Sequence, residues 1–304
     1  MPRPPEDYSD VLIDLILGYE CNVQCDYCSV TDAMRCENMS TAAALRELQA
    51  ARALGMHHVA FGGGEPTMRK DLLPLVRFCR DRGFDSIKVS SNGLMYSYPD
   101  FARRAVEAGV TLFHVSAMAH TPELYEKILG RKGSLDHVVK GVRNLVALGQ
   151  APVLDLIVKN DTYRHLADII EFWSREGVKT FALWLVSLSD RNRLNLESLP
   201  RVSEMRPDLY RAFDRASALG VVVYSRHIPV CMLPGYEANV FDLREDRVLV
   251  VTPNSRFFLW ESAISPSEYS PKCETCRHVR DACRGIRRDY LERFGDEEVV
   301  PCVR

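Results

Sequence analysis

The chain has 304 residues and a formal net charge of −2, with 39 Lys and Arg against 41 Asp and Glu. Its 46% hydrophobic and 26% charged residues are the balance of a folded globular protein and exclude a disordered chain. The near-even charge argues against a broad nucleic-acid-binding surface. The length allows one large domain or two ordinary ones.

The N-terminal segment shows no targeting pattern. Its first residues lack the charged-then-apolar order of a secretory signal. The most apolar early run, 11–18, contains Asp14 and is too short to span a membrane. We therefore expect a cytoplasmic protein with no membrane or nucleic-acid partner. In a reducing compartment, the ten cysteines are expected to bind metal or catalyse rather than form disulfides.

Short β-rich runs alternate with amphipathic helical stretches from residue 11 to residue 219. The predicted strands are 11–17, 57–61, 86–90, 111–115, 153–158 and 180–186. A first helix is capped by Ser40 and ends before Gly55, and the others span 71–82, 99–108, 135–148, 163–175 and 208–219. The repeats predict an α/β fold with a parallel sheet, either open or curled into a partial (β/α)6 TIM-like barrel, whose site lies at the C-terminal strand ends.

The pattern changes near residue 221. One more strand is predicted at 221–224, and strands at 247–251 and 256–260 flank a polar hairpin turn at 252–255. The remainder is short, polar and rich in cysteine. We therefore predict a core domain at 10–220 and a small C-terminal domain at 221–304, built from a β-hairpin and a helix.

Three cysteines follow the first predicted strand. Cys21, Cys25 and Cys28 have the spacing C-x3-C-x2-C. Three thiolates on a short loop suit three irons of a [4Fe–4S] cluster and leave the fourth iron open. Structural zinc is the weaker alternative, because it usually takes four ligands as two close pairs and no fourth ligand is obvious nearby.

The cysteine motif, placed after the first strand of a repeated β/α domain, resembles the signature of radical S-adenosylmethionine (SAM) enzymes. The resemblance continues at the ends of the second, third and fourth strands and beside the last cysteine. The residues that carry it there are Gly63, Gly64, Glu65, Ser91, Asn92, Ser116 and Tyr27. Taken alone, the glycines suit a tight turn and Ser116 suits a satisfied core hydroxyl.

The resemblance assigns these residues to SAM. It implies that backbone groups of 63–65 hold the amino group of the methionine part. Ser91, Asn92 and Ser116 would contact the ribose and carboxylate, and Tyr27 would lie near the adenine. The implied cofactors are SAM and a [4Fe–4S] cluster that cleaves it to a 5′-deoxyadenosyl radical, with a flavodoxin- or ferredoxin-like electron donor.

A second cysteine group lies near the C-terminus. Cys273, Cys276 and Cys283 have the spacing C-x2-C-x6-C, preceded by Cys231 and followed by Cys302. The arrangement resembles the SPASM and shorter twitch modules of some radical SAM enzymes, which implies an auxiliary [4Fe–4S] cluster. Cys231 is favoured over Cys302 as the fourth ligand because it precedes the hairpin. Four thiolates also suit zinc, which stays the alternative.

The remaining cysteines have simpler interpretations. Cys79 shares a helical stripe with Leu72, Leu75 and Val76, which predicts a small buried hydrophobic residue. Cys36 is expected to be an ordinary loop residue. If Cys302 is not a cluster ligand, it is either a terminal thiol without a role or, as in some radical SAM epimerases, a hydrogen donor to a substrate radical.

Substrate contacts are expected after the fifth and sixth strands, at 159–161 and 187–193. Arg191 and Arg193 suit a carboxylate or phosphate, or a solvated loop. His114 and His120 flank the end of the fourth strand and are structural by default. Only about ten residues precede the first strand, so a leader-peptide recognition domain is not expected.

The predicted function is oxidation of a small metabolite, by dehydrogenation or bond formation, or its epimerisation. The alternatives are a maturase of a ribosomally made peptide and a non-catalytic iron–sulfur electron-transfer or scaffold protein.

Overall fold

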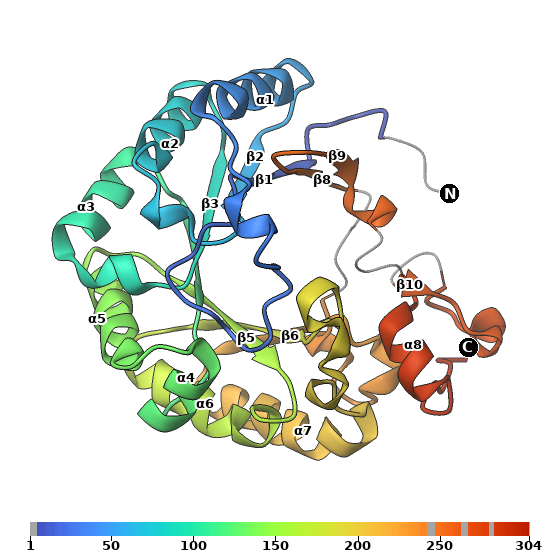
Figure 1. The fold of residues 1–304 in the computed structure, drawn as a ribbon. Helices are drawn as coiled ribbons and strands as arrows, with labels where there is room; N and C mark the ends of the chain where they lie inside the picture. Colours follow the sequence, from blue (N-terminus) through green and yellow to red (C-terminus); the bar gives the residue numbers. More distant parts are fainter. Residues whose placement is uncertain (1–4, 242–246, 263–266, 280–282, 304) are drawn as a thin grey trace.

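The computed structural model describes residues 5–241, 247–262, 267–279 and 283–303. Residues 242–246, 263–266, 280–282 and 304 of the predicted C-terminal domain lie outside this description. Helices form an arc around the outside of a curved sheet, and the C-terminal segment lies at the open side of the arc (Figure 1). Within the described residues, no helix is both long and apolar enough to cross a membrane.

A nine-stranded sheet runs in the order β7-β6-β5-β4-β3-β2-β1-β8-β9. Its strands are β1 Leu12–Ile16, β2 His58–Gly62, β3 Ser86–Ser91, β4 Leu112–Ser116, β5 Val153–Val158, β6 Thr180–Leu185, β7 Val222–Arg226, β8 Val248–Val251 and β9 Arg256–Phe258. All neighbours pair in parallel except β8 and β9. The sheet therefore has two edges, β7 and β9, and forms the predicted partial barrel.

The helices that follow the strands close the outer face. They are α1 Thr41–Ala53, α2 Leu72–Asp81, α3 Pro99–Ala108, α4 Pro122–Leu129, α5 Ser134–Ala147, α6 Leu166–Arg175 and α7 Val202–Leu219. A further helix, α8 Arg288–Phe294, lies in the C-terminal segment at the open side of the arc. Ser40 caps α1 as predicted, since its hydroxyl accepts the backbone N–H of Ala43 at 3.2 Å. The Cys79 side chain is fully buried in the hydrophobic core, which confirms its interpretation as a core residue.

Two helical features differ from the prediction. The helix α4 was not predicted, although Thr121 accepts from the backbone N–H of Leu124 and Pro122 occupies the first turn, a typical helix start. The helix α7 begins at Val202 rather than at the predicted residue 208, and Pro207 lies inside it. Proline is here tolerated in the second turn of a long helix.

Burial alternates along β1, β3 and β5, where every second residue is fully buried. The buried residues, such as Ile13, Leu15 and Val89, belong to the core shared with the helices. The half-exposed residues face the interior of the barrel. A Cβ added at Gly62 on β2, for example, would lie 3.8 Å from Asp14 Oδ1 and 3.7 Å from Ile16 Cδ1 of β1. The barrel interior is consequently lined by polar as well as apolar side chains.

The predicted hairpin is present, and it is also part of the main sheet. Residues Leu12 to Leu15 of β1 pair in parallel with Val248 to Val251 of β8, and β9 returns antiparallel to β8. The sheet therefore includes residues on both sides of position 221, and the division into domains stays a prediction.

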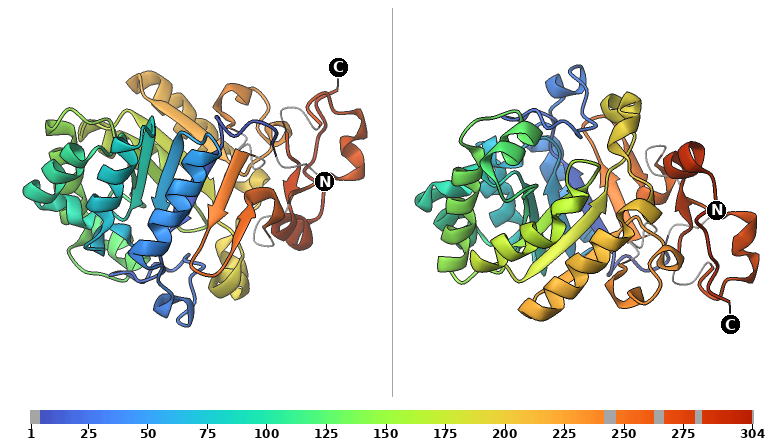
Figure 2. Two further views of the ribbon diagram at one scale, coloured as in Figure 1. Left: turned by 90° about the horizontal axis from the view of Figure 1, so that it is seen from above. Right: turned by 90° about the horizontal axis from the view of Figure 1, so that it is seen from below.

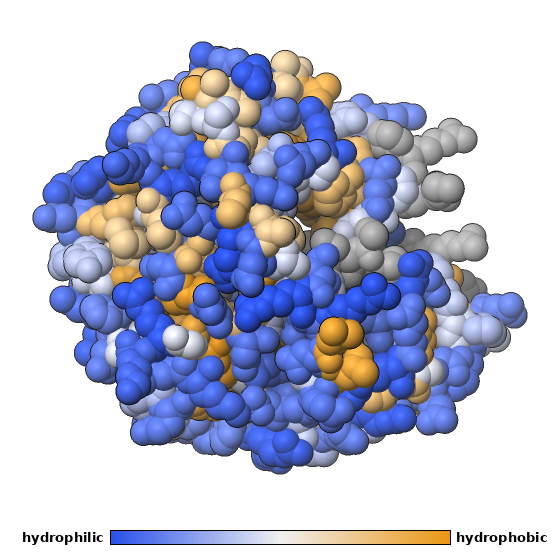
Figure 3. All heavy atoms as spheres, in the orientation of Figure 1, coloured by the Kyte–Doolittle hydropathy of each residue, from blue (hydrophilic) through white to orange (hydrophobic). Residues whose placement is uncertain are grey.

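The segment after β9 lies beside the barrel in both perpendicular views (Figure 2). It contains a short antiparallel pair, β10 Ser267–Glu268 with β11 Ile286–Arg287, followed by α8. Arg287 attaches it to the barrel, because its guanidinium donates to the carbonyl oxygens of Leu185 at 2.7 Å and Val186 at 2.6 Å. The face shown in Figure 3 is largely hydrophilic, with apolar residues in separate patches.

Candidate active site

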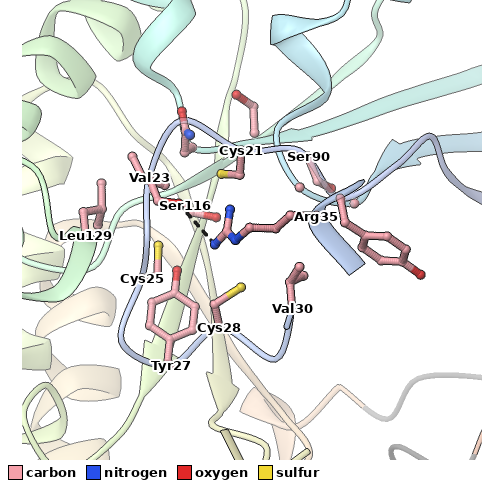
Figure 4. Close-up of a pocket in the computed structure, with 15 residues that line it drawn as sticks. Cys21, Val23, Cys25, Tyr27, Cys28, Val30, Arg35, Ser90, Ser116 and Leu129 are labelled. Carbon is pink, nitrogen blue, oxygen red and sulfur yellow. Dashed lines mark hydrogen bonds between the residues drawn. The ribbon is translucent and has the colours of Figure 1, made fainter. Parts of the chain in front are cut away.

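The first cysteine group lines a pocket at the C-terminal ends of the strands. Cys21, Cys25 and Cys28 lie on the loop after β1, and their sulfur atoms turn towards a common space (Figure 4). Of the other sequence-predicted residues, Tyr27, Gly63, Gly64, Ser91, Asn92 and Ser116 line the same pocket. The fold thus brings together segments from β1 to β4 that are up to about a hundred residues apart.

The cysteine loop is fastened to neighbouring elements by its backbone. The N–H groups of Gln24 and Asp26 donate to the carbonyl oxygens of Leu129 and Ile128 at the end of α4, at 3.2 and 3.0 Å. These bonds also satisfy carbonyl groups that a helix end leaves free. The unpredicted helix α4 therefore supports the cysteine loop directly.

Lys159 fixes the same loop through its side chain. It follows β5, its side chain is only 4% exposed, and its Nζ lies 2.9 Å from both Asp26 Oδ2 and Asp161 Oδ2. A buried ammonium needs such paired carboxylates. The sequence placed residues 159–161 near substrate, whereas the structure uses Lys159 and Asp161 to hold the loop.

The two glycines of the second strand end allow the cysteine loop to approach closely. Gly63 has a φ of +120°, and a Cβ there would lie 2.1 Å from the carbonyl oxygen of Gly18. A Cβ on Gly64 would lie 2.2 Å from the carbonyl oxygen of Glu20. Any side chain at either position would push the loop that carries Cys21 away from β2.

Glu65 is buried behind the pocket wall and ties two strand ends together. Its Oε1 accepts from the Thr67 N–H at 3.0 Å and the Ser91 hydroxyl at 2.8 Å, and its Oε2 accepts from the Asn92 N–H at 2.7 Å. Burial raises the pKa of this carboxyl, and the hydrogen bonds oppose that rise. The carboxylate therefore sets the position of Ser91 and Asn92.

Sequence reasoning missed Arg35, whose side chain extends into the space between the three sulfur atoms (Figure 4). Its terminal nitrogen donates to the carbonyl oxygen of Val23 at 3.5 Å, while its Nε is buried without a partner. Among the described residues, no three His, Cys, Asp or Glu side chains stand close enough together to hold a single ion. An arginine beside thiols suits a ligand with negative charge.

The environment of Cys21 and Cys25 disfavours free thiolates. Burial raises the pKa of Cys25 to about 12, although the Tyr27 hydroxyl hydrogen-bonds its sulfur and opposes the rise. Burial also raises the pKa of Cys21. Deprotonation at neutral pH therefore requires a bound cation such as iron. The Tyr27 hydroxyl is directed at a sulfur atom.

The second cysteine group also comes together. Burial raises the pKa of Cys231 to about 12, and the nearby thiols of Cys283, Cys302, Cys273 and Cys276 raise it further. Cys302 is hydrogen-bonded to Cys276. Both proposed fourth ligands, Cys231 and Cys302, are thus close to the C-x2-C-x6-C motif, and the choice between them stays a prediction. Cys36 is exposed.

The other predicted polar residues separate into different places. Arg191 and Arg193 have exposed side chains on the surface. His120 packs against His165 with ring centroids 5.8 Å apart, and burial lowers its pKa. His114 instead points into the barrel, where its Nδ1 lies 3.0 Å from Asp155 Oδ2. Of these four residues, only His114 lies on the barrel interior.

The geometry defines a (β/α) barrel with a three-cysteine pocket at its strand ends. The family description of the radical SAM superfamily matches residues 15–173. The chain belongs to this superfamily, and it is an enzyme. Iron–sulfur and SAM binding are general properties of the superfamily, whereas the role of each residue in this chain is a matter of proposal.

Curated relatives match part of the chain. A probable GTP 3',8-cyclase of Saccharolobus solfataricus is 28% identical over 184 residues, which is 60% of this chain and 57% of the relative. The probable GTP 3',8-cyclase of Methanopyrus kandleri is 29% identical over 162 residues, or 52% of each chain. This chain therefore matches little more than half the length of these relatives.

Solved structures share the fold at low identity. Native anSMEcpe with bound AdoMet (SAM) superposes with a TM-score of 0.64 at 14% identity, over 96% of this chain and 93% of that one. Streptococcus suis SuiB bound to its precursor peptide SuiA has a TM-score of 0.57 at 15% identity, over 69% of this chain and 47% of SuiB. These structures support the radical SAM fold with a C-terminal extension.

Proposed function

We propose that Cys21, Cys25 and Cys28 ligate a [4Fe–4S] cluster and that SAM binds beside it in the same pocket. The observation that carries this proposal is the convergence of three thiols with the strand-end residues of β2, β3 and β4 on one pocket. The donor set fits the group, because three sulfur ligands leave one iron free for SAM. The buried Arg35 Nε adds a donor suited to an anionic ligand.

Each part of the pocket wall has a distinct task in this proposal. The closely packed Gly63 and Gly64 present backbone groups to the amino group of SAM. Ser91, Asn92 and Ser116 face its ribose and carboxylate, with Glu65 fixing the first two from behind. Tyr27 lies near the adenine, and its hydroxyl stabilises the Cys25 thiolate. When bound, the reduced cluster supplies the electron that cleaves SAM to the 5′-deoxyadenosyl radical.

We further propose an auxiliary [4Fe–4S] cluster held by Cys231, Cys273, Cys276 and Cys283. The gathering of five thiols in the C-terminal segment supports it, and four thiolates complete the ligation of such a cluster. The proposed reaction is oxidation of a small metabolite, with epimerisation as the neighbouring outcome. The names of the curated relatives describe a small-molecule reaction, which supports a metabolite over a peptide. A flavodoxin- or ferredoxin-like protein is the proposed electron donor.

The test is formation of 5′-deoxyadenosine from SAM. The protein is reconstituted anaerobically with iron and sulfide and incubated with SAM and dithionite. We expect wild type to form 5′-deoxyadenosine, and Cys28→Ala to form none. Cys36→Ala is the matched control, because Cys36 is exposed and outside the pocket, and it should match wild type. A wild-type protein that carries the cluster but forms no 5′-deoxyadenosine would favour the electron-transfer or scaffold alternative.

A further inference from the structure

Polar side chains continue from the pocket into the barrel interior. Ser116, which lines the pocket, pairs in register with Asp155 on β5. His114 precedes it by two residues on the same face of β4. Trp184 on β6 pairs in register with Arg226 on β7, and both are half-buried. His114, Asp155, Trp184 and Arg226 therefore form one wall of the interior, and Ser116 connects this wall to the proposed SAM pocket.

Asp155 fixes the orientation of two of these side chains. Its Oδ1 accepts the indole N–H of Trp184 at 2.9 Å, and its Oδ2 lies 3.0 Å from His114 Nδ1. An ionised carboxylate only accepts hydrogen bonds, so the His114 hydrogen lies on Nδ1. The other ring nitrogen, Nε2, has no hydrogen-bond partner among the described residues. It is available to a hydroxyl or amino group.

Arg226 is held by aromatic rings rather than by an acid. Its guanidinium carbon lies 4.4 Å from the ring centroid of Phe241, 4.7 Å from that of Trp184 and 5.2 Å from that of Tyr224. Its Nε is buried without a hydrogen-bond partner, and no carboxylate in the described part of the chain forms an ion pair with it. Aromatic faces stabilise a cation without neutralising it.

A second arginine at the same edge of the barrel, Arg287, differs from Arg226 because it has acidic and carbonyl partners. Arg287 is 3% exposed, and its nitrogens donate to Asp289 and to backbone carbonyl oxygens of 185 and 186. The hydrogen-bond donors of Arg287 thus attach the C-terminal segment to the barrel. His227 lies between the two arginines, and burial lowers its pKa to about 3, so that it stays neutral. Arg226 is thus the cation of this wall that remains for a ligand.

We propose that Arg226, His114, Asp155 and Trp184 form the substrate-recognition site, and that the substrate is a small anionic molecule. Arg226 binds its carboxylate or phosphate through the paired donors of the guanidinium. His114 Nε2 forms a hydrogen bond with a hydroxyl or amino group of the same molecule, and Asp155 and Trp184 hold the two recognition groups in place. This assignment rests on the proposed function, because the substrate site adjoins the pocket assigned to SAM.

The test is anion binding by the reconstituted, SAM-loaded protein at constant ionic strength. Inorganic phosphate and acetate are titrated separately, with glycerol as a neutral control, and tryptophan fluorescence is followed because Trp184 contacts Arg226. We expect saturable binding of at least one anion, and phosphate against acetate distinguishes the two anionic groups. Arg226→Gln should weaken it by about tenfold or more, and Arg226→Lys by less. The control Arg193→Gln, an exposed arginine, should bind as wild type does.

Two results would overturn the inference. One is wild type that binds neither anion saturably. The other is Arg226→Gln, with a thermal midpoint close to that of wild type, that binds as tightly as wild type. Formation of 5′-deoxyadenosine by wild type is measured in parallel. If that reaction proceeds while anion binding fails, the substrate site is wrong and the proposed SAM chemistry stands. If it does not proceed, the proposed function itself fails.

Discussion

The neighbouring glycines 62 and 64 should respond very differently to the same substitution. An alanine Cβ at Gly64 would lie 2.2 Å from the carbonyl oxygen of Glu20 and 2.5 Å from that of Tyr19. Relief requires the cysteine loop to move by about 1 Å, because non-bonded heavy atoms pack at roughly 3.5 Å. That movement strains the hydrogen bond from Glu65 N–H to the Glu20 carbonyl oxygen, which is 2.8 Å long. At Gly62, a Cβ would meet side-chain atoms only at 3.7 and 3.8 Å, which is ordinary contact.

The expected cost of Gly64→Ala is about 2–4 kcal/mol, from forced repacking and a weakened hydrogen bond. For a chain of this size, whose unfolding entropy is about 0.6 kcal/mol/K, that lowers the thermal midpoint by about 3–6 °C. Because Cys21 follows Glu20 directly, iron loading should fall as well. Gly62→Ala should load iron as wild type does and change stability by less than about 1 kcal/mol. Differential scanning fluorimetry and iron analysis under anaerobic conditions measure both effects. Equal iron content and equal midpoints in the two variants would refute the close approach of the loop.

Three further substitutions test groups that support the site. Lys159→Met leaves the partly buried Asp26 without its cation, so stability should fall by about 1–3 kcal/mol, with a lower thermal midpoint and less bound iron. Lys127→Met, on the surface, is the control and should change little. Equal effects of the two substitutions would contradict the role of Lys159 in holding the cysteine loop. Glu65→Gln places a side-chain amide N–H against one of the groups that donate to Glu65, so the protein should be destabilised by about 1–3 kcal/mol. The thermal midpoint measures this loss, and an unchanged midpoint would argue against the hydrogen bonds of the carboxylate. Burial keeps His227 neutral in the fold with a pKa of about 3, against 6.5 when exposed, so the unfolded chain binds the additional proton and stability is lost as the pH falls below 6.5. Between pH 7.5 and 5.5 wild type should lose about 1.4 kcal/mol more than His227→Asn in denaturant unfolding, and parallel losses would show that this histidine is accessible to protons.

Local sequence signals predicted the six strand–helix repeats, the capping role of Ser40 and the buried Cys79, because each depends on a pattern within one element. These signals did not predict features that depend on a contact between residues far apart in the sequence. A helix was predicted to begin at residue 208, yet α7 begins at Val202, where the Val202 N–H donates to the hydroxyl of Tyr290 at 2.8 Å. The pairing of β8 with β1 joins residues more than two hundred positions apart, and no local pattern encodes it.

The same distinction applies to the site. Spacing singled out the three cysteines, and the resemblance to radical SAM enzymes singled out the strand-end glycines. Both groups lie on loops that follow adjacent strands and line one pocket. Arg35, by contrast, enters the pocket from a short helical turn with no recognisable motif. Lys159 was expected near substrate, but its ammonium is taken by Asp26 and Asp161. The partner of a charged side chain depends on the fold, so its role could not be read from its position in the chain.

The most direct test of two iron–sulfur clusters is iron and acid-labile sulfide per chain after anaerobic reconstitution. Wild type should contain about eight irons. The triple variant Cys21→Ala, Cys25→Ala, Cys28→Ala should retain about four, and so should the variant with alanine at 273, 276 and 283. About four irons in wild type, falling to none when the first group is removed, would contradict the auxiliary cluster and leave the C-terminal thiols as zinc ligands or free cysteines.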